Sequence, residues 1–360
     1  MKDLPVDSVL VVGSASVHTW RFLAGIAPHA SKVYLACNGE VPEAWRPPNL
    51  AGTLQVDFGL RALGTARRLR DWVRQVRPAI VQVHQANSVA WHARRALTGL
   101  SVPWVLTAWG SDVLLLPRRG RWLRQMVSAN LEAASAVTSD SLHMAAVIRA
   151  LAPVARMEVV NFGMDALPAA PRLAEKPLNV LSCRLHKPLY RIDAIVRAWA
   201  EVEADPALAG WTLTVAASGE ESGRLQALAS SLGLSRLQFT GFVTPEVLAG
   251  LYQQARVFVS VPESDATSIS LLEAMGHGCL PVLSNLPANL EWVLDGINGM
   301  IVEDVARLGA ALRVALGRAA DDAVLSGAAA LNRRLVEQKG LHRPNMARFA
   351  ALYRALLDGT

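Results

Sequence analysis

One stretch in the second half of the chain constrains the fold most strongly, because two kinds of secondary structure alternate in it around a polar loop. The apolar run 257–261 has the length and β-branching of a buried strand, and it ends before Pro262. A polar loop, 263–268, precedes the helical run 269–277, and residues 281–283 begin another strand. This order predicts a βαβ unit, whose ligand site lies at the carboxyl end of its first strand.

The same alternation extends along the whole chain. In the first half we expect strands at 9–12, 32–37, 79–84, 104–108, 136–138 and 157–160. In the second half we expect strands at 178–183, 212–216, 237–239, 257–261, 280–284 and 300–302. Strands that alternate with helices form parallel sheets with helices on both faces. The sequence therefore predicts an α/β protein with two doubly wound, Rossmann-like domains.

The boundary between the two domains is expected in a proline-containing segment without apolar periodicity. We interpret 1–165 as a first domain, 166–177 as a linker and 178–342 as a second domain. A chain of 360 residues is long enough for two separate cores. No apolar run reaches the length of about 18 residues that a membrane-spanning helix needs, and the first residues do not read as a signal peptide.

The start of the helical run 269–277 is a candidate anion site. Backbone N–H groups in the first turn of a helix have no helical acceptor and carry the positive end of the dipole, so they can bind a phosphate or a sugar hydroxyl. Two carboxylates, Asp265 and Glu273, flank this turn. Two simpler interpretations remain open. Glu273 could complete a capping box with Ser270, and Asp265 could be a loop or cap residue.

This stretch resembles the E-x7-E signature of the retaining GT-B glycosyltransferases of family 4, the glycosyl transferases group 1. Asp265 takes the place of the first glutamate and Glu273 that of the second. The segments LEAM at 272–275, GCLPV at 278–282 and EWVLDGING at 291–299 match the family's following motifs in order and without gaps. The resemblance implies two domains that face each other across a cleft. It also implies that a last helix, within 343–360, packs back on the first domain.

The resemblance further implies that the second domain binds a UDP- or GDP-sugar. Arg184 would clamp the diphosphate, Asp265 would bind the sugar, and Glu273 would bind the ribose hydroxyls. A strand-end arginine with a purely structural role is the simpler alternative for Arg184. The other candidates for donor binding are Tyr190, Gly219, Phe242, Val243, Ala266, Thr267, Ser268 and Ile269, together with Gly13 and Ser14, whose small-residue turn lets a ligand approach the backbone closely.

Two departures from the family pattern affect the donor side. Tyr190 stands where the family has the second cation of its diphosphate clamp, a lysine. Lys187 or Arg191 could supply that charge by another route, or a hydroxyl could replace it. The first glycine of the family's G-x-G, which should precede Gly219, is also absent. The turn after the first strand contains Gly13 and Ser14 but no G-x-G-x-x-G, so a nicotinamide-binding fingerprint is missing.

Three residues at strand ends of the first domain are candidates for the sugar and acceptor side. His84 ends the run IVQVH and matches the second histidine of the family's H-x-H, whereas Gln82 replaces the first. The resemblance implies that His84 orients the donor sugar, although a strand-end histidine is more often structural. Trp109 and Asp112 resemble the family's H-G-x-D turn, with tryptophan in place of histidine, and would shape the acceptor side.

The positive charge is concentrated in the first half of the chain. Residues 1–165 contain 18 Lys and Arg against 11 Asp and Glu, whereas the remainder contains 18 against 19. Two arginine clusters stand out, Arg67–Arg77 and Arg118–Arg124, the second with Trp122 among its arginines. Solvated helix faces are one interpretation. An anionic membrane surface or a phosphate-bearing acceptor is the other. Nucleic acid is not expected, because no reader motif accompanies the charge.

From these features we expect a retaining glycosyltransferase that acts on a glycan or polyprenyl- or lipid-linked acceptor in cell-surface polysaccharide or glycolipid assembly. Its expected catalytic residues are His84, Arg184 and Asp265. Glu263 and Asp265 resemble a metal motif of a different fold, but no further ligands accompany them, so neither metal nor cofactor is expected. Three cysteines, an odd number, fit a cytoplasmic protein. The arginine clusters would let it associate peripherally with the inner face of the membrane.

Two other functions remain open. An epimerase of sugar nucleotides, or a synthase of soluble sugar phosphates, could use the same fold. A GT-B scaffold that has lost catalysis and only binds a partner is the second alternative.

Overall fold

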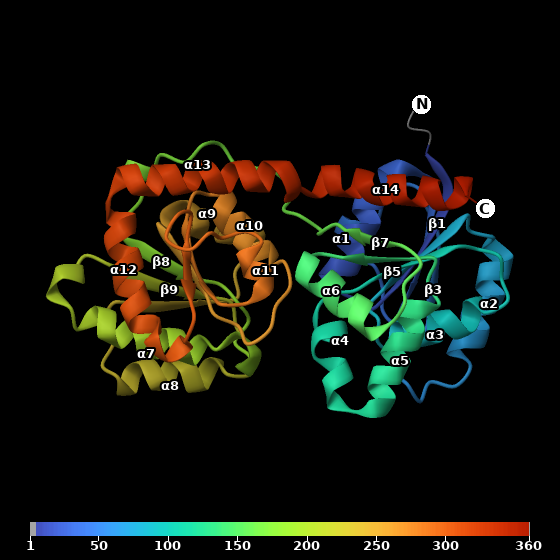
Figure 1. Ribbon diagram of the computed structural model, residues 1–360, viewed down its shortest axis with the longest axis horizontal. Helices are drawn as coiled ribbons and strands as arrows, with labels where there is room; N and C mark the ends of the chain where they lie inside the picture. Colours follow the sequence, from blue (N-terminus) through green and yellow to red (C-terminus); the bar gives the residue numbers. More distant parts are fainter. Residues whose placement is uncertain (1–4, 360) are drawn as a thin grey trace. The chain divides into compact units, whose positions relative to one another are not determined.

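The computed structural model describes residues 5–359 and divides them into two compact units (Figure 1). The described part of the first unit runs to Phe162 and resumes at His342, and the second unit extends from Gly163 to Leu341. Each unit contains a parallel sheet with helices on both faces, so the predicted fold class is confirmed. Within 5–359, no helix is long and apolar enough to cross a bilayer.

A parallel sheet of seven strands forms the centre of the first unit, in the order β3-β2-β1-β4-β5-β6-β7. The chain places β2 and β3 on one side of β1 and then β4 to β7 on the other, so the strand order reverses between β1 and β4. A doubly wound sheet binds ligands beyond the carboxyl ends of the strands at such a reversal. The strands are β1 (Val6–Gly13), β2 (Ala30–Cys37), β3 (Leu50–Gln55), β4 (Ile80–His84), β5 (Trp104–Thr107), β6 (Ala136–Ser139) and β7 (Met157–Val159).

Strand β3 is the one strand of this sheet that the sequence does not predict. It lies at the edge of the sheet, and its residues alternate between half-buried and exposed positions. An edge strand with little buried surface lacks the continuous apolar run of a central parallel strand. The six other strands of this sheet lie where they are predicted.

Helices cover both faces of the first sheet. On one face α1 and α14 pack together, and Phe22, Phe349 and Tyr353 from these two helices are fully buried in the core. On the other face α2, α3 and α5 lie beside one another (Figure 1). The predicted return of the last helix to the first domain is therefore confirmed. The helices are α1 (Val17–Ile26), α2 (Thr65–Val76), α3 (Ser88–Leu97), α4 (Ser111–Leu114), α5 (Arg121–Glu132), α6 (Leu142–Leu151) and α14 (His342–Asp358), with 3₁₀ turns η1 (Ala27–His29), η2 (Glu43–Trp45) and η3 (Leu116–Arg119).

The second unit repeats this topology with six parallel strands in the order β10-β9-β8-β11-β12-β13. The reversal here lies between β8 and β11. The strands are β8 (Asn179–Ser182), β9 (Thr212–Ala216), β10 (Leu237–Gly241), β11 (Val257–Ser260), β12 (Leu280–Ser284) and β13 (Met300–Val302). The helices are α7 (Ile192–Glu203), α8 (Ser222–Ser231), α9 (Pro245–Gln254), α10 (Ile269–Gly276), α11 (Pro287–Leu290), α12 (Leu308–Ala320) and α13 (Asp322–Lys339), with η4 (Leu173–Glu175), η5 (Pro188–Tyr190), η6 (Pro206–Leu208) and η7 (Val305–Arg307).

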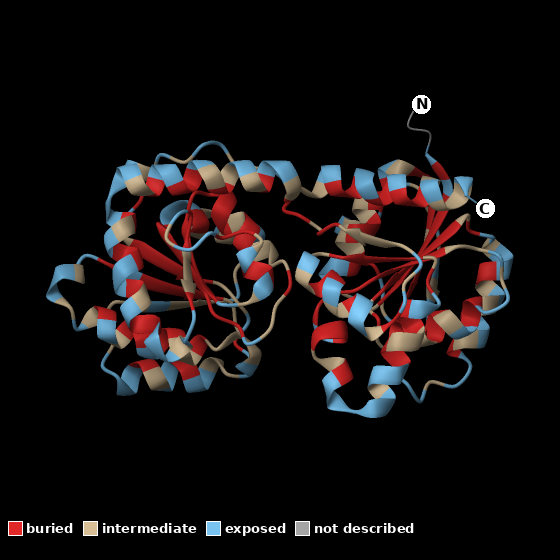
Figure 2. Cartoon of the chain, viewed as in Figure 1, coloured by how far each residue is buried: buried red, intermediate tan, exposed pale blue. Residues whose placement is uncertain are grey.

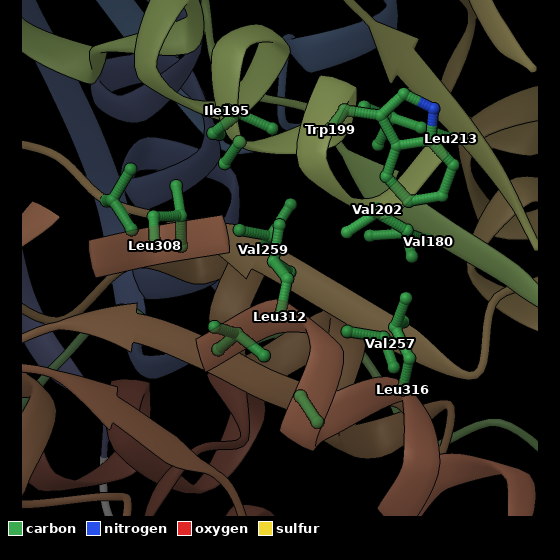
Figure 3. Close-up of a cluster of buried hydrophobic side chains, with 14 of the residues drawn as sticks. Val180, Ile195, Trp199, Val202, Leu213, Val257, Val259, Leu308, Leu312 and Leu316 are labelled. Atoms are coloured by element: carbon green, nitrogen blue, oxygen red, sulfur yellow. The ribbon is translucent and has the colours of Figure 1, made fainter. Parts of the chain in front are cut away.

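The core of the second unit lies on both faces of its sheet. Figure 2 shows buried strands and helices that are exposed along one side. On one face, Trp199 of α7 is fully buried in a cluster with side chains of β8, β9, β11 and α12 (Figure 3). Replacing such a buried tryptophan by alanine typically costs about 3–5 kcal/mol. On the other face, α9 and α10 bury Tyr252, Leu271 and Leu272 against the sheet. The second cluster lies directly beneath the candidate donor residues.

Residues 166–177, which connect the predicted domains, are anchored to the second unit by a buried lysine. The Lys176 ammonium donates hydrogen bonds to the carbonyl oxygens of Tyr252 at 3.1 Å, Ala255 at 2.7 Å and His277 at 2.8 Å. These carbonyls lie at the C-terminal ends of α9 and α10, where helices lack internal donors and attract cations. Burial lowers the pKa of Lys176, but the three carbonyls satisfy its donors. This contact fixes the connecting segment beneath the helix that carries the candidate donor site.

Candidate functional site

The carboxyl ends of β8 and β11 are neighbours at the reversal of the second sheet. Arg184 follows β8, and the loop 261–268 follows β11 and leads into α10. Two segments that are far apart in the sequence therefore bring their candidate side chains to one place at the sheet edge. This is the position at which an open parallel sheet binds its ligand.

Arg184 is the centre of a polar cluster at this edge. Its Nη1 lies 2.8 Å from Oδ2 of Asp265, donates to Oγ of Ser268, and lies 3.4 Å from Oγ of Ser270. The Arg184 and Asp265 side chains are only 13% and 20% exposed, so water screens their attraction weakly. Burial alone would lower the pKa of Arg184, but the Asp265 carboxylate and Tyr190 raise it overall. The guanidinium is therefore a permanent cation held in a fixed orientation.

Tyr190, which stands where the family has a lysine, packs its ring against this guanidinium. The carbon of the Arg184 guanidinium lies 4.4 Å from the centroid of the Tyr190 ring, which is a cation–π arrangement. Arg191, one proposed substitute for the missing lysine, donates from Nε to Val261 O and from Nη2 to Pro262 O, both at 2.7 Å. Arg191 thus braces the backbone of the loop after β11. Lys187, the other candidate, is exposed on the same segment.

The start of α10 is free of a side-chain cap. Its N-cap residue is Ser268, whose hydroxyl bonds to none of the first N–H groups because it accepts from Arg184 and lies 2.7 Å from the hydroxyl of Ser270. The N–H groups of Ile269 and Ser270 have no helical acceptor, as at any helix start. Helix dipole and guanidinium together place positive charge here, which suits a diphosphate. Asp265 holds the preceding turn, since its Oδ1 accepts from the N–H of Ala266 at 3.0 Å.

Glu273 lies one turn into α10, and its carboxylate accepts a hydrogen bond from a buried tyrosine. The hydroxyl of Tyr252 lies 3.1 Å from Oε2 of Glu273 and 3.1 Å from Sγ of Cys183. Burial, reinforced by the neighbouring Cys183 and Glu273, raises the pKa of Tyr252 well above its ordinary value, so the tyrosine stays a neutral donor. The alternative of a capping box is wrong, because the helix begins after Ser268 and Ser270 is not its N-cap residue. Sequence reasoning missed Tyr252, since nothing local distinguishes it from a core tyrosine.

The loop after β9 contacts the segment after β8 through Gly219. A Cβ atom at Gly219 would lie 2.4 Å from the carbonyl oxygen of His186, so only glycine fits. The glycine that the family pattern requires two residues earlier is replaced by Ala217, which nevertheless adopts a left-handed conformation with a φ of 75°. This conformation is strained for a residue with a side chain. A glycine at this position would adopt the same backbone conformation without strain.

Three other predicted donor residues lie at neighbouring loop positions. Phe242 follows β10 and is 79% exposed, so its ring is available to stack on a planar ligand. Val243 packs on the core beneath α9 and α10. The hydroxyl of Thr267 lies 3.4 Å from Nε1 of the buried Trp292, which belongs to the EWVLDGING segment. That segment therefore contacts the turn before α10 through Trp292.

In the first unit, Gly13 and His84 end β1 and β4, the two strands between which the strand order reverses. The His84 ring is fully buried against Phe22 and Trp109, whose ring centroids lie 4.5 and 5.6 Å away. Burial, and to a smaller extent His18, lowers the pKa of His84 to about 3. At neutral pH the ring is therefore uncharged, and its conjugate acid is too strong for His84 to be an effective general base.

The two other candidates in the first unit brace the loop after β4. Asp112 is buried, and its two carboxylate oxygens accept from the N–H groups of Ala86 at 2.6 Å and Trp109 at 3.0 Å. It thus joins the ends of β4 and β5 and exposes almost no surface, so it shapes this side of the unit indirectly. Ser14 follows β1, and its hydroxyl donates to Gln85 Oε1 at 3.2 Å.

The two arginine clusters of the first unit differ in structure. In the first, Arg70 reaches the carbonyl oxygen of Ala96 and Arg67 lies 3.9 Å from Asp71. In the second, the segment η3 to α5 presents Trp122, 54% exposed, among exposed arginines. These are Arg118, Arg119, Arg121 and Arg124. Within the described residues, none of these four arginines has an ion-pair partner.

Carboxylates and other metal-ligating groups do not gather in the described part of the chain, where no three His, Cys, Asp or Glu residues lie close enough to hold a metal ion. Glu263 is exposed, and Asp265 is committed to Arg184 and the backbone.

Comparison with known proteins gives two matches to family models that together extend over most of the chain. Residues 8–141 match the model described as glycosyl transferase 4-like, and residues 176–318 match that of the glycosyl transferases group 1. Each match lies within one of the two structural units. Among curated proteins, a serotype-specific mannosyltransferase, WbdA of Escherichia coli, is 31% identical over 135 residues. That alignment covers 36% of this chain and only 17% of the mannosyltransferase.

Solved structures with the same fold cover nearly the whole chain. HepE of Anabaena, determined in complex with UDP and glucose, superposes with a TM-score of 0.78 and 16% identity over 96% of this chain and 99% of that one. A sucrose-phosphate synthase from Thermosynechococcus elongatus superposes with a TM-score of 0.80 and 17% identity over 98% of this chain and 100% of that one. At sequence identities of 16% and 17%, these superpositions show a shared fold.

Proposed function

Because the chain belongs to the GT-B glycosyltransferases, we propose that it transfers a sugar from a UDP- or GDP-sugar to a glycan or a polyprenyl- or lipid-linked acceptor. The observation that carries this proposal is the cluster of Arg184, Asp265 and Ser268 at the start of α10. It combines a fixed cation with an uncapped helix start, the two features that bind a diphosphate. The UDP and glucose bound to HepE support a nucleotide-sugar donor.

In this proposal the second unit holds the donor. The diphosphate lies at the N–H groups of Ile269 and Ser270 with the guanidinium of Arg184 beside it. Glu273, oriented by Tyr252, accepts from the ribose hydroxyls, and the exposed ring of Phe242 stacks on the base. As the sugar leaves, negative charge grows on the diphosphate, and Arg184 stabilises that charge more strongly in the transition state than in the ground state.

We propose that transfer retains the anomeric configuration by a front-face reaction. Both oxygens of Asp265 are engaged, one by Arg184 and one by the N–H of Ala266, and Glu273 is held by Tyr252. These contacts hold both carboxylates in fixed orientations, which suits them to bind hydroxyl groups of the donor rather than to attack the anomeric carbon. The bond from the anomeric carbon to the β-phosphate oxygen breaks, the acceptor oxygen bonds to that carbon on the same face, and the acceptor's proton passes to the departing phosphate. His84, being neutral, orients the sugar without exchanging a proton.

The acceptor side is proposed to belong to cell-surface polysaccharide or glycolipid assembly. The similarity to a mannosyltransferase named as serotype-specific supports a surface glycan. The exposed arginines from Arg118 to Arg124, with Trp122 among them, suit peripheral binding to an anionic membrane, since arginines near such a surface gain about 1 kcal/mol each. The proposed location is the cytoplasmic face of the membrane.

A soluble sugar-phosphate synthase is a second candidate function, favoured by the superposition on a sucrose-phosphate synthase. Such an enzyme releases a soluble product and has no use for a membrane-binding surface. Vesicle binding and the solubility of the product therefore distinguish the two candidates.

The proposed function is tested by incubating the protein with UDP-glucose or GDP-mannose and a lipid-linked glycan acceptor, with and without EDTA. We expect a glycosylated acceptor whose new anomeric centre, identified by NMR coupling constants, has the configuration of the donor. We also expect the activity to survive chelation, because Arg184 and the start of α10 provide the positive charge that a metal ion would otherwise supply. An inverted product would contradict retention, and loss of activity restored only by Mg²⁺ or Mn²⁺ would contradict metal independence.

A further inference from the structure

The hydrogen bond between Trp109 and His84 determines which nitrogen of the histidine carries the proton. Nε1 of Trp109 lies 3.2 Å from Nδ1 of His84. An indole N–H is only a donor, so Nδ1 of His84 must be its acceptor and carries no proton. A neutral imidazole with a bare Nδ1 has its proton on Nε2. The tautomer thus follows from the chemistry of the partner.

The protonated nitrogen, Nε2, has no acceptor among the described residues although it is buried. The ring lies in an aromatic box whose members, Phe22, Trp109 and Phe162, have centroids between 4.5 and 6.0 Å from its own. None of these three side chains can accept a conventional hydrogen bond. Buried donors are almost always satisfied in proteins, so the partner of this N–H is expected to come from outside the described residues.

The position of His84 in the fold indicates that a ligand binds nearby. His84 ends β4 beside the end of β1, at the reversal of strand order where doubly wound sheets bind their ligands. The three rings of the box carry no charge, and burial, with a smaller contribution from His18, lowers the pKa of His84 to about 3. A neutral N–H donor suits a neutral or negatively charged oxygen. Since the ring itself is covered, a ligand reaches Nε2 only after one of the surrounding side chains turns aside.

We propose that Trp109 is a positioning residue that fixes His84 as the Nε2–H tautomer, so that this N–H donates to an oxygen of the bound sugar. The identity of that oxygen rests on the proposed function, whereas the tautomer does not. The indole replaces the imidazole that the family pattern places at this position. A histidine there could donate or accept, but tryptophan can only donate. The substitution therefore restricts His84 to one protonation pattern.

Nitrogen NMR of the full-length protein labelled in its histidine rings tests the tautomer directly. The eight histidines are resolved by their long-range ring correlations, and His84 is assigned from its loss in His84→Gln. We expect the His84 signals of the Nε2–H form at neutral pH. His342 is an internal reference of the opposite kind, because its Nδ1 lies 2.6 Å from the carbonyl oxygen of Phe162 and so must be protonated. Nδ1–H or imidazolium signals from His84 would overturn the proposal.

Trp109→Phe, which keeps an aromatic ring but removes the N–H, tests the role of Trp109. We expect a mixture of tautomers at His84 and a fall in kcat/KM for transfer of about five- to tenfold, the loss typical of one hydrogen bond. The matched control is Trp72→Phe, since Trp72 packs edge-on against Tyr34 in the same unit and should affect neither the tautomer nor the rate. An unchanged tautomer in Trp109→Phe would overturn the proposal. A shifted tautomer with an unchanged transfer rate would overturn its second half.

The two readouts separate this proposal from the proposed function. If no nucleotide sugar is consumed by the wild-type protein, the transferase assignment fails while the NMR result still decides the tautomer. If transfer proceeds but His84 is not in the Nε2–H form, the transferase assignment stands and the inference about Trp109 fails.

Discussion

Arg184 and Asp265 form an ion pair of 2.8 Å although 81 positions separate them in the sequence. The pair joins the loop after β8 to the loop after β11, and the Tyr190 ring packs against the guanidinium. The arginine and the aspartate are the residues to which the family resemblance assigns the diphosphate and the sugar. Because the two side chains are bonded to each other, we expect a substitution at either residue to alter the orientation of the other.

The first prediction concerns this ion pair. Arg184→Ala should lower kcat more than it raises the KM for the donor, because the charge that Arg184 stabilises grows toward the transition state. A loss of at least one charged hydrogen bond, about 1.5–3 kcal/mol, corresponds to a rate reduction of roughly 10- to 150-fold. Steady-state kinetics with a fixed acceptor measure both constants.

Arg191→Ala is the comparison for this experiment, since Arg191 bonds to backbone carbonyls of the same loop. It should lower the melting temperature more than Arg184→Ala does. If kcat is unchanged in Arg184→Ala but falls in Arg191→Ala, the second arginine is the one that carries the transition-state charge.

The second prediction concerns the support of Glu273 by Tyr252. Tyr252→Phe removes only the hydroxyl that lies 3.1 Å from Oε2 of Glu273, so the affinity for UDP or GDP should fall by about five- to tenfold, the effect of one hydrogen bond. Glu273→Gln should weaken the same binding by about 1.5–3 kcal/mol, because it removes the charged acceptor itself. Calorimetric titration measures both. The double variant should lose little more than Glu273→Gln alone, and full additivity would show that the hydroxyl does not act through Glu273.

Much of the fold and part of the candidate site could be predicted from the sequence. The central strands are continuous apolar runs, and a parallel sheet places their carboxyl ends at one edge, so the segments that carry Arg184 and Asp265 were expected to meet. The edge strand β3 carries no such run and was not predicted. Tyr252 was also not predicted, because it lies 21 positions from Glu273 and its contact depends on how α9 packs against α10. Long-range side-chain contacts of this kind have no local signal.

Ala217 shows how a missing motif residue can be misleading. The absent glycine weakened the resemblance at this loop, yet the backbone keeps the left-handed φ of 75° that glycine would favour. The third prediction follows from this strain. Ala217→Gly should increase the free energy of unfolding by up to about 1 kcal/mol, the strain of 1–2 kcal/mol being partly offset by the greater freedom of glycine in the unfolded chain. Denaturant titration measures the change.

Ala209→Gly is the matched control, since Ala209 is exposed and has an ordinary helical φ of −58°. This replacement should destabilise the protein by about 0.5–1 kcal/mol. If both glycine variants are destabilised equally, the backbone at Ala217 is not strained.

The fourth prediction concerns the arginines around Trp122. The protein should sediment with vesicles that contain anionic lipid at low salt and be released at high salt, because the attraction falls off within a Debye length of about 8–10 Å. Replacing Arg118, Arg119 and Arg121 by glutamine should weaken the binding by roughly 3 kcal/mol at most and reduce transfer to a lipid-linked acceptor. Hydrolysis of the donor should be unaffected.

A triple replacement of exposed arginines in the second unit, at Arg307, Arg313 and Arg334, changes the net charge equally and should leave vesicle binding intact. The proposal would be contradicted if the protein bound neutral and anionic vesicles equally, or if both triple variants lost vesicle binding to the same extent. The arginines of η3 and α5 would then be ordinary solvent-exposed residues.

The central claim, that Arg184 and the start of α10 bind the diphosphate of a nucleotide sugar, is tested most directly by calorimetric titration with nucleoside mono- and diphosphates. The wild-type protein should bind UDP or GDP at least tenfold more tightly than the corresponding monophosphate, because the second phosphate reaches the guanidinium and the helix start. In Arg184→Ala this preference should largely disappear while the monophosphate binds as before. Equal affinity of the wild-type protein for mono- and diphosphate, or a preference that survives in Arg184→Ala, would contradict the account.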